Sequence, residues 1–286
     1  MRSFLIAIFN LMFLVGPVGA QQTGLGVSQT PLPGPNKDAE LLMNRAFAAI
    51  TANTVPITDI SLTCAVHRIA GGEDETGTAT LRALATGESR MDFTFPSGQR
   101  SEVHANSTTG PIGSWSGPDG IAKGLAQFNI LVDSAWFSPD LVLSKLVNSK
   151  ETVASAVSSE TRSGAAIEHL TLSRQFPSAP AQMSRRMQRD SQMEVYLDAS
   201  SLLPQALDFN THPDTDAGRN LLVEIRYSDY KAEQGLVMPF HIQQYVNGAL
   251  ALDLQVQRVE LNSGLSPAMF IVPESALATP VFRTSR

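Results

Sequence analysis

The chain has 286 residues, a formal net charge of −6 at pH 7 and a single cysteine. The acidic balance argues against nucleic acid as a partner, because surfaces that bind nucleic acid are basic. One cysteine cannot form an internal disulfide, so the fold must be held by its apolar core.

The first 20 residues have the layout of a secretory signal peptide. Arg2 precedes an apolar run from Phe4 to Val15, Gly16-Pro17 ends the run, and Val18-Gly19-Ala20 places small residues where a signal peptidase cleaves. The run is short for a hydrocarbon core of ~30 Å, so cleavage after Ala20 is expected, with an uncleaved anchor as the alternative. We therefore expect an exported protein, periplasmic or secreted. Residues 21–35, rich in Gly, Pro, Gln and Thr, are expected to form a flexible leader.

The predicted folded domain, residues 36–275, begins with a helix. Asn36 is its expected N-cap, and apolar residues recur at helical spacing to about Ala52. From Pro56 the period changes to two, which predicts antiparallel strands joined by short turns such as Gly71-Gly72. Cys64 lies on the apolar side of the first strand and is expected to be a buried, unreactive thiol. The apolar positions of this set of strands include Ile60, Leu62, Val66, Ala79, Leu81, Met91, Phe93 and Phe95.

The centre of the chain predicts two helices. Apolar residues at helical spacing predict one from Ile121 to Val132, with Phe128 on its apolar side. Ser138-Pro139-Asp140 supplies an N-cap, a proline at the first helical position and an acidic first turn, which predicts a second helix to about Val147. Two amphipathic helices between two sets of strands must pack on the apolar face of the sheet. We expect them to form a movable lid with Trp136 near its edge.

Strands resume near Thr152 and continue to about Leu261, and Asn247-Gly248 predicts a tight hairpin. The fold class is therefore mainly β (α+β), with a large curved antiparallel sheet and about three helices covering it. Residues 276–286 are expected to form a C-terminal tail. The predicted apolar faces of these strands are Met193, Val195 and Leu197; Leu221, Val223, Ile225 and Tyr227; Met238, Phe240, Ile242 and Val246; and Leu250, Leu252, Leu254 and Val256.

The sequence lacks the motifs of a catalytic site, including G-x-S-x-G, the Walker loop and a G-x-G-x-x-G after a strand. We therefore expect no enzyme activity and no cofactor. The five histidines lack the close spacing of a metal site, so we also expect no bound metal. Arg185-Arg186 and Arg189 form a basic cluster with two interpretations. They contact an acidic partner or lipid headgroups, or they belong to a solvated turn or strand edge.

The C-terminal half carries a resemblance to a known family. In order, Val195-Tyr196-Leu197-Asp198, Leu203-Pro204, Tyr227-Ser228-Asp229-Tyr230, Gly235, Pro239-Phe240, Ile242, Gly248, Val259, Leu261-Asn262, Phe270 and Pro273 are similar to the end of proteins related to the periplasmic lipoprotein carrier LolA, its receptor LolB and the sensor RseB. The order of helices and strands agrees with that family too. The resemblance implies an unclosed β-barrel of about eleven antiparallel strands with helices across its mouth.

The resemblance also implies a function. It suggests a carrier or binding protein that holds a lipid, an acyl chain or a lipoprotein on an apolar concave face, with peripheral membrane contact left open. The alternative is an envelope sensor or protein-interaction module of the same fold, with an envelope protein as its partner and no small-molecule ligand. The pattern alone leaves open whether the candidate lining is pocket or core. The candidate lining residues are Met91, Phe93, Phe95, Phe128, Met238, Phe240 and Ile242.

Overall fold

The structure, a computed structural model, describes residues 34–51, 56–108, 110–132, 134–214, 216 and 218–277. The predicted signal peptide, almost all of the predicted leader and residues 278–286 lie outside the described residues. Within the described ranges, no helix is long and apolar enough to cross a membrane.

The described chain forms one antiparallel sheet of 13 strands with short helices around it. The helices are α1 (Lys37–Thr51), α2 (Pro139–Asn148), α3 (Ala181–Asp190) and α4 (Glu274–Leu277), with the 3₁₀ turns η1 (Gln127–Asn129) and η2 (Pro267–Phe270). The strands are β1 (Asp59–Ala70), β2 (Glu73–Leu84), β3 (Ser89–Phe95), β4 (Gly98–Ser107), β5 (Gly110–Ser116), β6 (Ala122–Gly124), β7 (Thr152–Arg162), β8 (Ala165–Arg174), β9 (Met193–Asp198), β10 (Pro204–Thr211), β11 (Leu221–Glu233), β12 (Leu236–Val246) and β13 (Ala249–Leu261).

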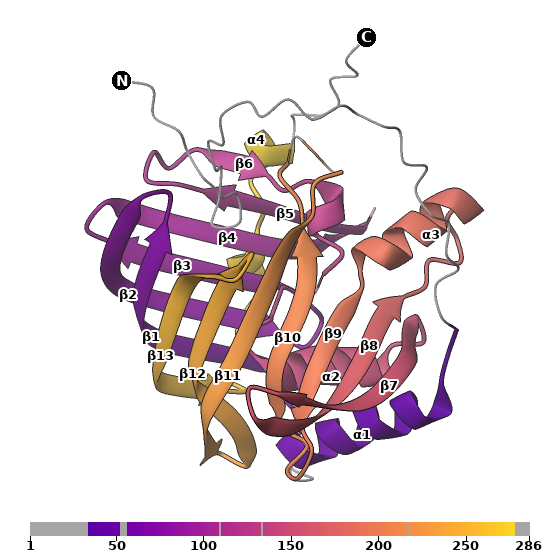
Figure 1. Cartoon of the computed structure of the whole chain (residues 1–286). Coiled ribbons are helices and arrows are strands. Elements are labelled where there is room, and N and C mark those ends of the chain that lie inside the picture. Colours follow the sequence, from indigo (N-terminus) through magenta and orange to yellow (C-terminus); the bar gives the residue numbers. More distant parts are fainter. Residues whose placement is uncertain are drawn as a thin grey trace, which may run out of the picture.

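Two meanders join at the middle of the sheet. The strand order is β6-β5-β4-β3-β2-β1-β13-β12-β11-β10-β9-β8-β7, so the first and last strands pair with each other and β6 and β7 are the two edges. The sheet bends so that β2 to β4 pass crosswise behind β9 to β11 (Figure 1). One buried cluster contains inward side chains from both arms and from α1 and α2. The predicted curved, unclosed sheet is confirmed, with 13 strands in place of about eleven.

Helix α1 forms where the sequence predicts it. The Asn36 side-chain oxygen accepts hydrogen bonds from the backbone amides of Asp38 (2.8 Å) and Ala39 (3.2 Å), which is an N-cap. Its predicted apolar stripe is buried, including Ala46 and Ile50 at zero exposure. The stripe packs into the main cluster, so tertiary burial adds to the local helix signal.

The turns and faces of the strands follow the predicted alternation with one exception. Asn247 and Gly248 both have positive φ (49° and 80°), as a two-residue hairpin of this sequence requires. Near this hairpin, the register of β12 and β13 shifts by one residue: Tyr245 pairs with Leu250, whereas the preceding Gln244 pairs with Leu252. This bulge moves Leu250 off the inner face that Leu252 shares, so its predicted place on that face is wrong.

The predicted helix from Ile121 to Val132 is wrong. The segment contains β6 and η1 instead, and the Leu125 amide donates to the Gly113 carbonyl at 2.9 Å, which prolongs the sheet. A Cβ on Gly124 would lie 2.4 Å from the Ala276 carbonyl oxygen, so α4 packs too closely on β6 for another residue there. The second predicted helix is confirmed as α2, with Pro139 at its start.

Helix α3 was not predicted, and it contains the basic cluster. Arg185, Arg186 and Arg189 lie on an exposed helix and not on a turn or strand edge. The helix buries none of its side chains, so it lacks the apolar stripe that identifies α1. The sequence indicates this helix only weakly, by a proline followed by ten residues without glycine, proline or β-branched side chains.

Candidate functional site: the concave apolar face

The inner face of the sheet is the predicted ligand surface. Met91, Phe93 and Phe95 on β3 and Met238 and Ile242 on β12 point inward, and none of these residues is more than 5% exposed. All five belong to the cluster that joins the two arms with α1 and α2. These side chains therefore pack as core in this structure.

The two remaining candidate lining residues lie at the margin or elsewhere. Phe240 is half-buried against the cluster, and the Lys231 ammonium lies 4.3 Å from its ring centroid. Phe128 lies in η1 and packs edge-on against His212, with ring centroids 5.3 Å apart. The neighbouring Asn129 side-chain oxygen accepts from the His212 amide at 2.9 Å, so Phe128 belongs to the contact between η1 and the end of β10.

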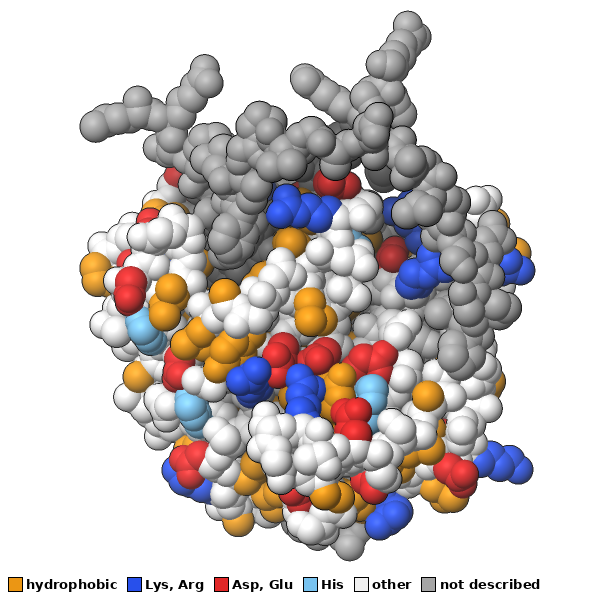
Figure 2. Space-filling model, viewed as in Figure 1, with side chains coloured by type: hydrophobic (Ala, Val, Ile, Leu, Met, Phe, Trp, Pro, Cys, Tyr) orange, Lys and Arg blue, Asp and Glu red, His pale blue; other side chains and the backbone are white. Residues whose placement is uncertain are grey.

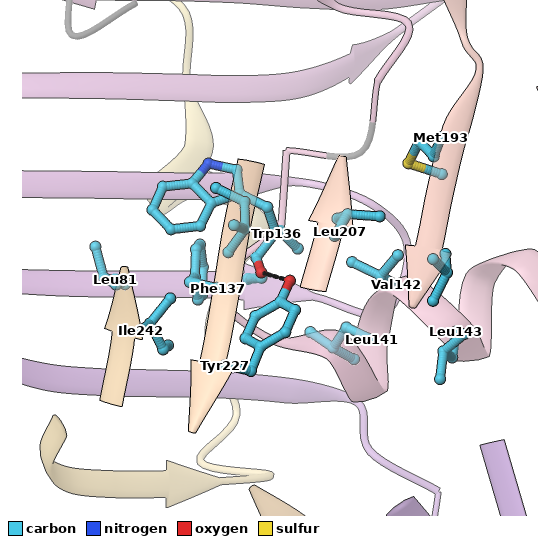
Figure 3. Close-up of a cluster of buried hydrophobic side chains, with 14 of the residues drawn as sticks. Leu81, Trp136, Phe137, Leu141, Val142, Leu143, Met193, Leu207, Tyr227 and Ile242 are labelled. Carbon is cyan, nitrogen blue, oxygen red and sulfur yellow. Dashed lines mark hydrogen bonds between the residues drawn. The ribbon is translucent and has the colours of Figure 1, made fainter. Parts of the chain in front are cut away.

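The apolar face is covered by residues 134–148, here called the cover, which comprise a turn at residues 134–137 followed by α2. Trp136 and Phe137 are buried, and their rings meet nearly at right angles with centroids 6.0 Å apart. The Tyr227 hydroxyl donates a hydrogen bond of 2.6 Å to the Trp136 carbonyl. Figure 3 shows both rings between strands of the two arms, with Leu81 on one side and Tyr227 on the other.

The start of α2 places a carboxyl group inside this apolar environment. Asp140 is 1% exposed and accepts a hydrogen bond of 2.5 Å from the Ser138 hydroxyl. The Ser138 side chain makes no capping bond to the helix backbone. Burial raises the pKa of Asp140 to about 6, although the Ser138 hydroxyl and the backbone amides of Asp140 and Leu141 oppose the rise. The cover thus carries a group that resists ionisation while it stays closed.

One end of the inner face is polar. Arg68 continues the inward positions of β1, and Arg100 projects from β4. Both guanidinium groups contact the Glu73 carboxylate, that of Arg68 at 2.6 Å and that of Arg100 at 2.9 Å. Both arginines also lie 3.2 Å from Glu75, and Arg100 stacks over Phe95. This group is not predicted by the alternation alone; the feature of the sequence that indicates it is a charged residue, Arg68, at the end of the apolar positions from Ile60 to Val66. The buried cations are paired, so this end offers little net positive charge.

The outer face carries a second polar group. Figure 2 shows acidic, basic and histidine side chains gathered across the face turned to the viewer, over the strands that Figure 1 labels β8 to β12. Arg162, at the end of β7, lies 3.9 Å from the Tyr196 ring centroid and 2.6 Å from the Glu224 carboxylate. Burial raises the pKa of Asp208 to about 6, and the Glu224 charge adds to the rise while Arg162 opposes it. The group ties the β7–β8 hairpin to β10 and β11.

Four of the five histidines form separate pairs with carboxylates. His67, His104, His169 and His241 each hydrogen-bond a different carboxylate, at distances from 2.6 to 3.0 Å. Among the residues that the structure describes, no group of three or more His, Cys, Asp or Glu could hold a metal ion.

Comparison with known proteins rests on structure. A scan against protein-family models and a search of curated proteins by sequence find no match. Among solved structures, a domain described as an outer membrane lipoprotein-sorting protein domain from Vibrio parahaemolyticus superposes with a TM-score of 0.51 at 14% identity, covering 81% of this chain and 97% of that one. A LolA superfamily protein from Nitrosomonas europaea gives a TM-score of 0.51 at 14% identity, covering 82% of this chain and 97% of that one.

A third structure extends the likeness. A DUF1329 family protein from Desulfovibrio piger gives a TM-score of 0.52 at 12% identity, covering 83% of this chain and 98% of that one. Each of these three structures aligns with this chain over nearly its whole length. At these sequence identities the similarity concerns the backbone fold, and it assigns no role to individual residues of this chain. The chain has the LolA-like fold, an unclosed antiparallel β-barrel with helices at its concave face.

Proposed function

We propose that this protein is an exported binding protein that carries an apolar ligand, the acyl chain of a lipid or lipoprotein, between its concave sheet and its cover. The observation that carries the proposal is the way the apolar face is closed. In the sequence, the cover lies between β6 and β7, which are the two edge strands of the sheet. The cover itself takes part in no strand pairing. It can lift from the sheet without breaking a strand ladder.

The energies of the closed and loaded forms are comparable. Lifting the cover re-exposes its large buried apolar side chains, at about 2 kcal/mol each, or about 12 kcal/mol in all. They are Trp136, Phe137, Leu141, Val142, Leu143 and Leu146. Burying about fifteen methylenes of an acyl chain contributes about 0.8 kcal/mol each, which is again about 12 kcal/mol. A ligand of that size competes evenly with the cover for the same surface. Exchange is therefore feasible without unfolding of the sheet.

Two further points support the proposal. The similar structures include a domain described as lipoprotein-sorting and a LolA superfamily protein, which suggests the same use of the fold. The N-terminal sequence has the layout of a signal peptide, which suggests a periplasmic or secreted location, where such a carrier would meet membrane lipids. Neither point names the ligand.

Native mass spectrometry after mild purification tests the proposal. We expect co-purified lipid, and uptake of an acyl ligand from liposomes by protein stripped of it. Trp136 fluorescence, measured in a Trp115→Phe background, should change during uptake because the indole is on the cover. A clean unliganded spectrum with no uptake would refute the carrier. Capture of a single envelope protein in detergent, without lipid, would instead favour an interaction module.

A further inference from the structure

A polar side chain lies on the inner apolar face of the sheet, in the same row across the strands as Leu252 and Arg68. Gln244 points inward from β12, is fully buried, and sits between Ile225 on β11 and Leu252 on β13 in the strand register. Among the described residues, neither its amide nitrogen nor its amide oxygen has a hydrogen-bond partner. Buried amides are almost always hydrogen-bonded, because leaving them unpaired is costly. Gln244 is thus a functional candidate on the wall.

The neighbouring glutamine is the opposite case. Gln243 points to the outer face, where its amide nitrogen donates to Asp253 at 2.7 Å and its oxygen accepts from Tyr245 at 3.2 Å. Two adjacent glutamines on one strand therefore point to opposite faces of the sheet. The outer one is satisfied by protein groups, and the inner one is not.

The cover contributes another unpaired group near the same place. The Trp136 indole nitrogen is buried and also lacks a partner within the described structure. The Trp136 carbonyl is held by Tyr227, which pairs with Ile242, and Gln244 is the next inward residue after Ile242 on the same strand. Figure 3 shows the Trp136 ring above Phe137, with Ile242 and Tyr227 below, and the Trp136 carbonyl bonded to the Tyr227 hydroxyl. Two N–H donors and one acceptor thus belong to the same stretch of the interface between sheet and cover.

We propose that Gln244 and Trp136 bind the polar head of the ligand, and that this ligand is a neutral acyl ester carrying a free hydroxyl. The two N–H groups donate to the ester carbonyl, and the Gln244 oxygen accepts from the hydroxyl. The inference rests on the proposed function and specifies its ligand class. A bare hydrocarbon would leave all three groups unpaired.

The charges nearby favour a neutral head over an anionic one. Arg68 lies across Leu252 from Gln244 in the register, but its guanidinium is bound by Glu73 and Glu75. Asp140, at the start of α2, adds a buried carboxyl group and no positive charge to the cover. An anion would therefore enter without a free cation to receive it, which is unfavourable in an apolar site.

Displacement of an uncharged apolar dye from the purified full-length protein tests the inference. The probes are monododecanoylglycerol, dodecanoate and a hydrocarbon of equal length. We expect the wild type to prefer the monoacylglycerol over both other probes by about tenfold or more. Gln244→Leu should abolish this preference while binding the hydrocarbon at least as well, and Trp136→Phe should reduce the preference by several-fold.

The matched control is Gln243→Leu, on the outer face, which should keep the preference. The unliganded Gln244→Leu protein should melt at the same or a higher temperature, because an unpaired amide is replaced by an apolar group of similar size. A lower melting temperature would show that the amide is already satisfied within the protein and would overturn the inference. So would equal affinity for all three probes, which leaves the carrier proposal intact. Failure of every probe to displace the dye would overturn both.

Discussion

The buried carboxyl group at the start of α2 makes the stability of the closed cover depend on pH. The ordinary pKa of an aspartate is 3.8, and burial raises that of Asp140 to about 6. Since the folded state holds the proton more tightly than the unfolded state, the carboxyl stabilises the fold fully below about pH 4, and this contribution is lost as the pH rises through about 6. A rise of about two pKa units corresponds to about 3 kcal/mol.

Asp140→Asn isolates this contribution. The variant keeps an oxygen that can accept from Ser138 but cannot ionise, so we expect it to be more stable than the wild type by about 1–3 kcal/mol above about pH 7. The two proteins should have similar stability below about pH 4. The measurement is urea unfolding across this range for both proteins, and the difference between the curves removes other titrating groups such as Asp208.

A control with the opposite sign strengthens the design. The pKa of Asp198 is lowered to about 2 by hydrogen bonds from Ser200 and Ser201, so Asp198→Asn should lose stability at neutral pH. If the curves of wild type and Asp140→Asn run parallel from about pH 4 to 7, Asp140 is not buried as described. If Asp140 becomes solvated when the cover lifts, uptake of an uncharged dye should also increase with pH in the wild type, and less so in Asp140→Asn.

Four other predictions rest on the burial or on one contact of a single residue. Cys64, whose thiol pKa burial raises to about 12, should react with a thiol reagent only after unfolding, and rapid labelling of the native protein would contradict its burial. Phe137→Asp should destabilise the protein by more than about 3 kcal/mol in thermal unfolding, whereas Phe128→Asp, at a half-exposed site, should cost less than about 2; equal costs would disprove their different placements. Tyr227→Phe should cost about 1 kcal/mol and speed hydrogen exchange in α2, while unchanged exchange would mean that this bond does not hold the cover. Arg162→Ala should make the β7–β8 hairpin more sensitive to limited proteolysis, and an unchanged cleavage rate would show that the hairpin does not depend on this contact.

The elements that the sequence determines are those with local causes. Asn36 caps α1 with its own side chain, and the apolar stripe of that helix repeats at helical spacing. Asn247-Gly248 closes its hairpin because both residues adopt positive φ, which glycine and asparagine tolerate. Strict alternation predicts the inner positions of β3, including Met91 and Phe93, because a strand turns successive side chains to opposite faces.

The remaining features depend on contacts between residues distant in the sequence. The segment from Ile121 to Val132 has helical spacing, yet residues 122–125 bond to the edge of the sheet, where the Leu125 amide donates to the Gly113 carbonyl. In the same way, Leu250 follows the alternation of its strand, but a bulge turns it away. Local propensity is weak compared with the hydrogen bonds and burial that a preformed sheet edge provides.

The candidate site shows the same division. The sequence identifies the apolar residues of the concave face, because each strand displays its own alternation. It does not reveal that Trp136 is buried rather than near the edge of the cover, that Arg162 reaches Glu224 on another strand, or that Gln244 is unpaired among apolar neighbours. These relations depend on how far the sheet bends and on which strands its bend brings together. Sheet curvature is the sum of small twists and bulges along 13 strands, so only the assembled tertiary structure decides it.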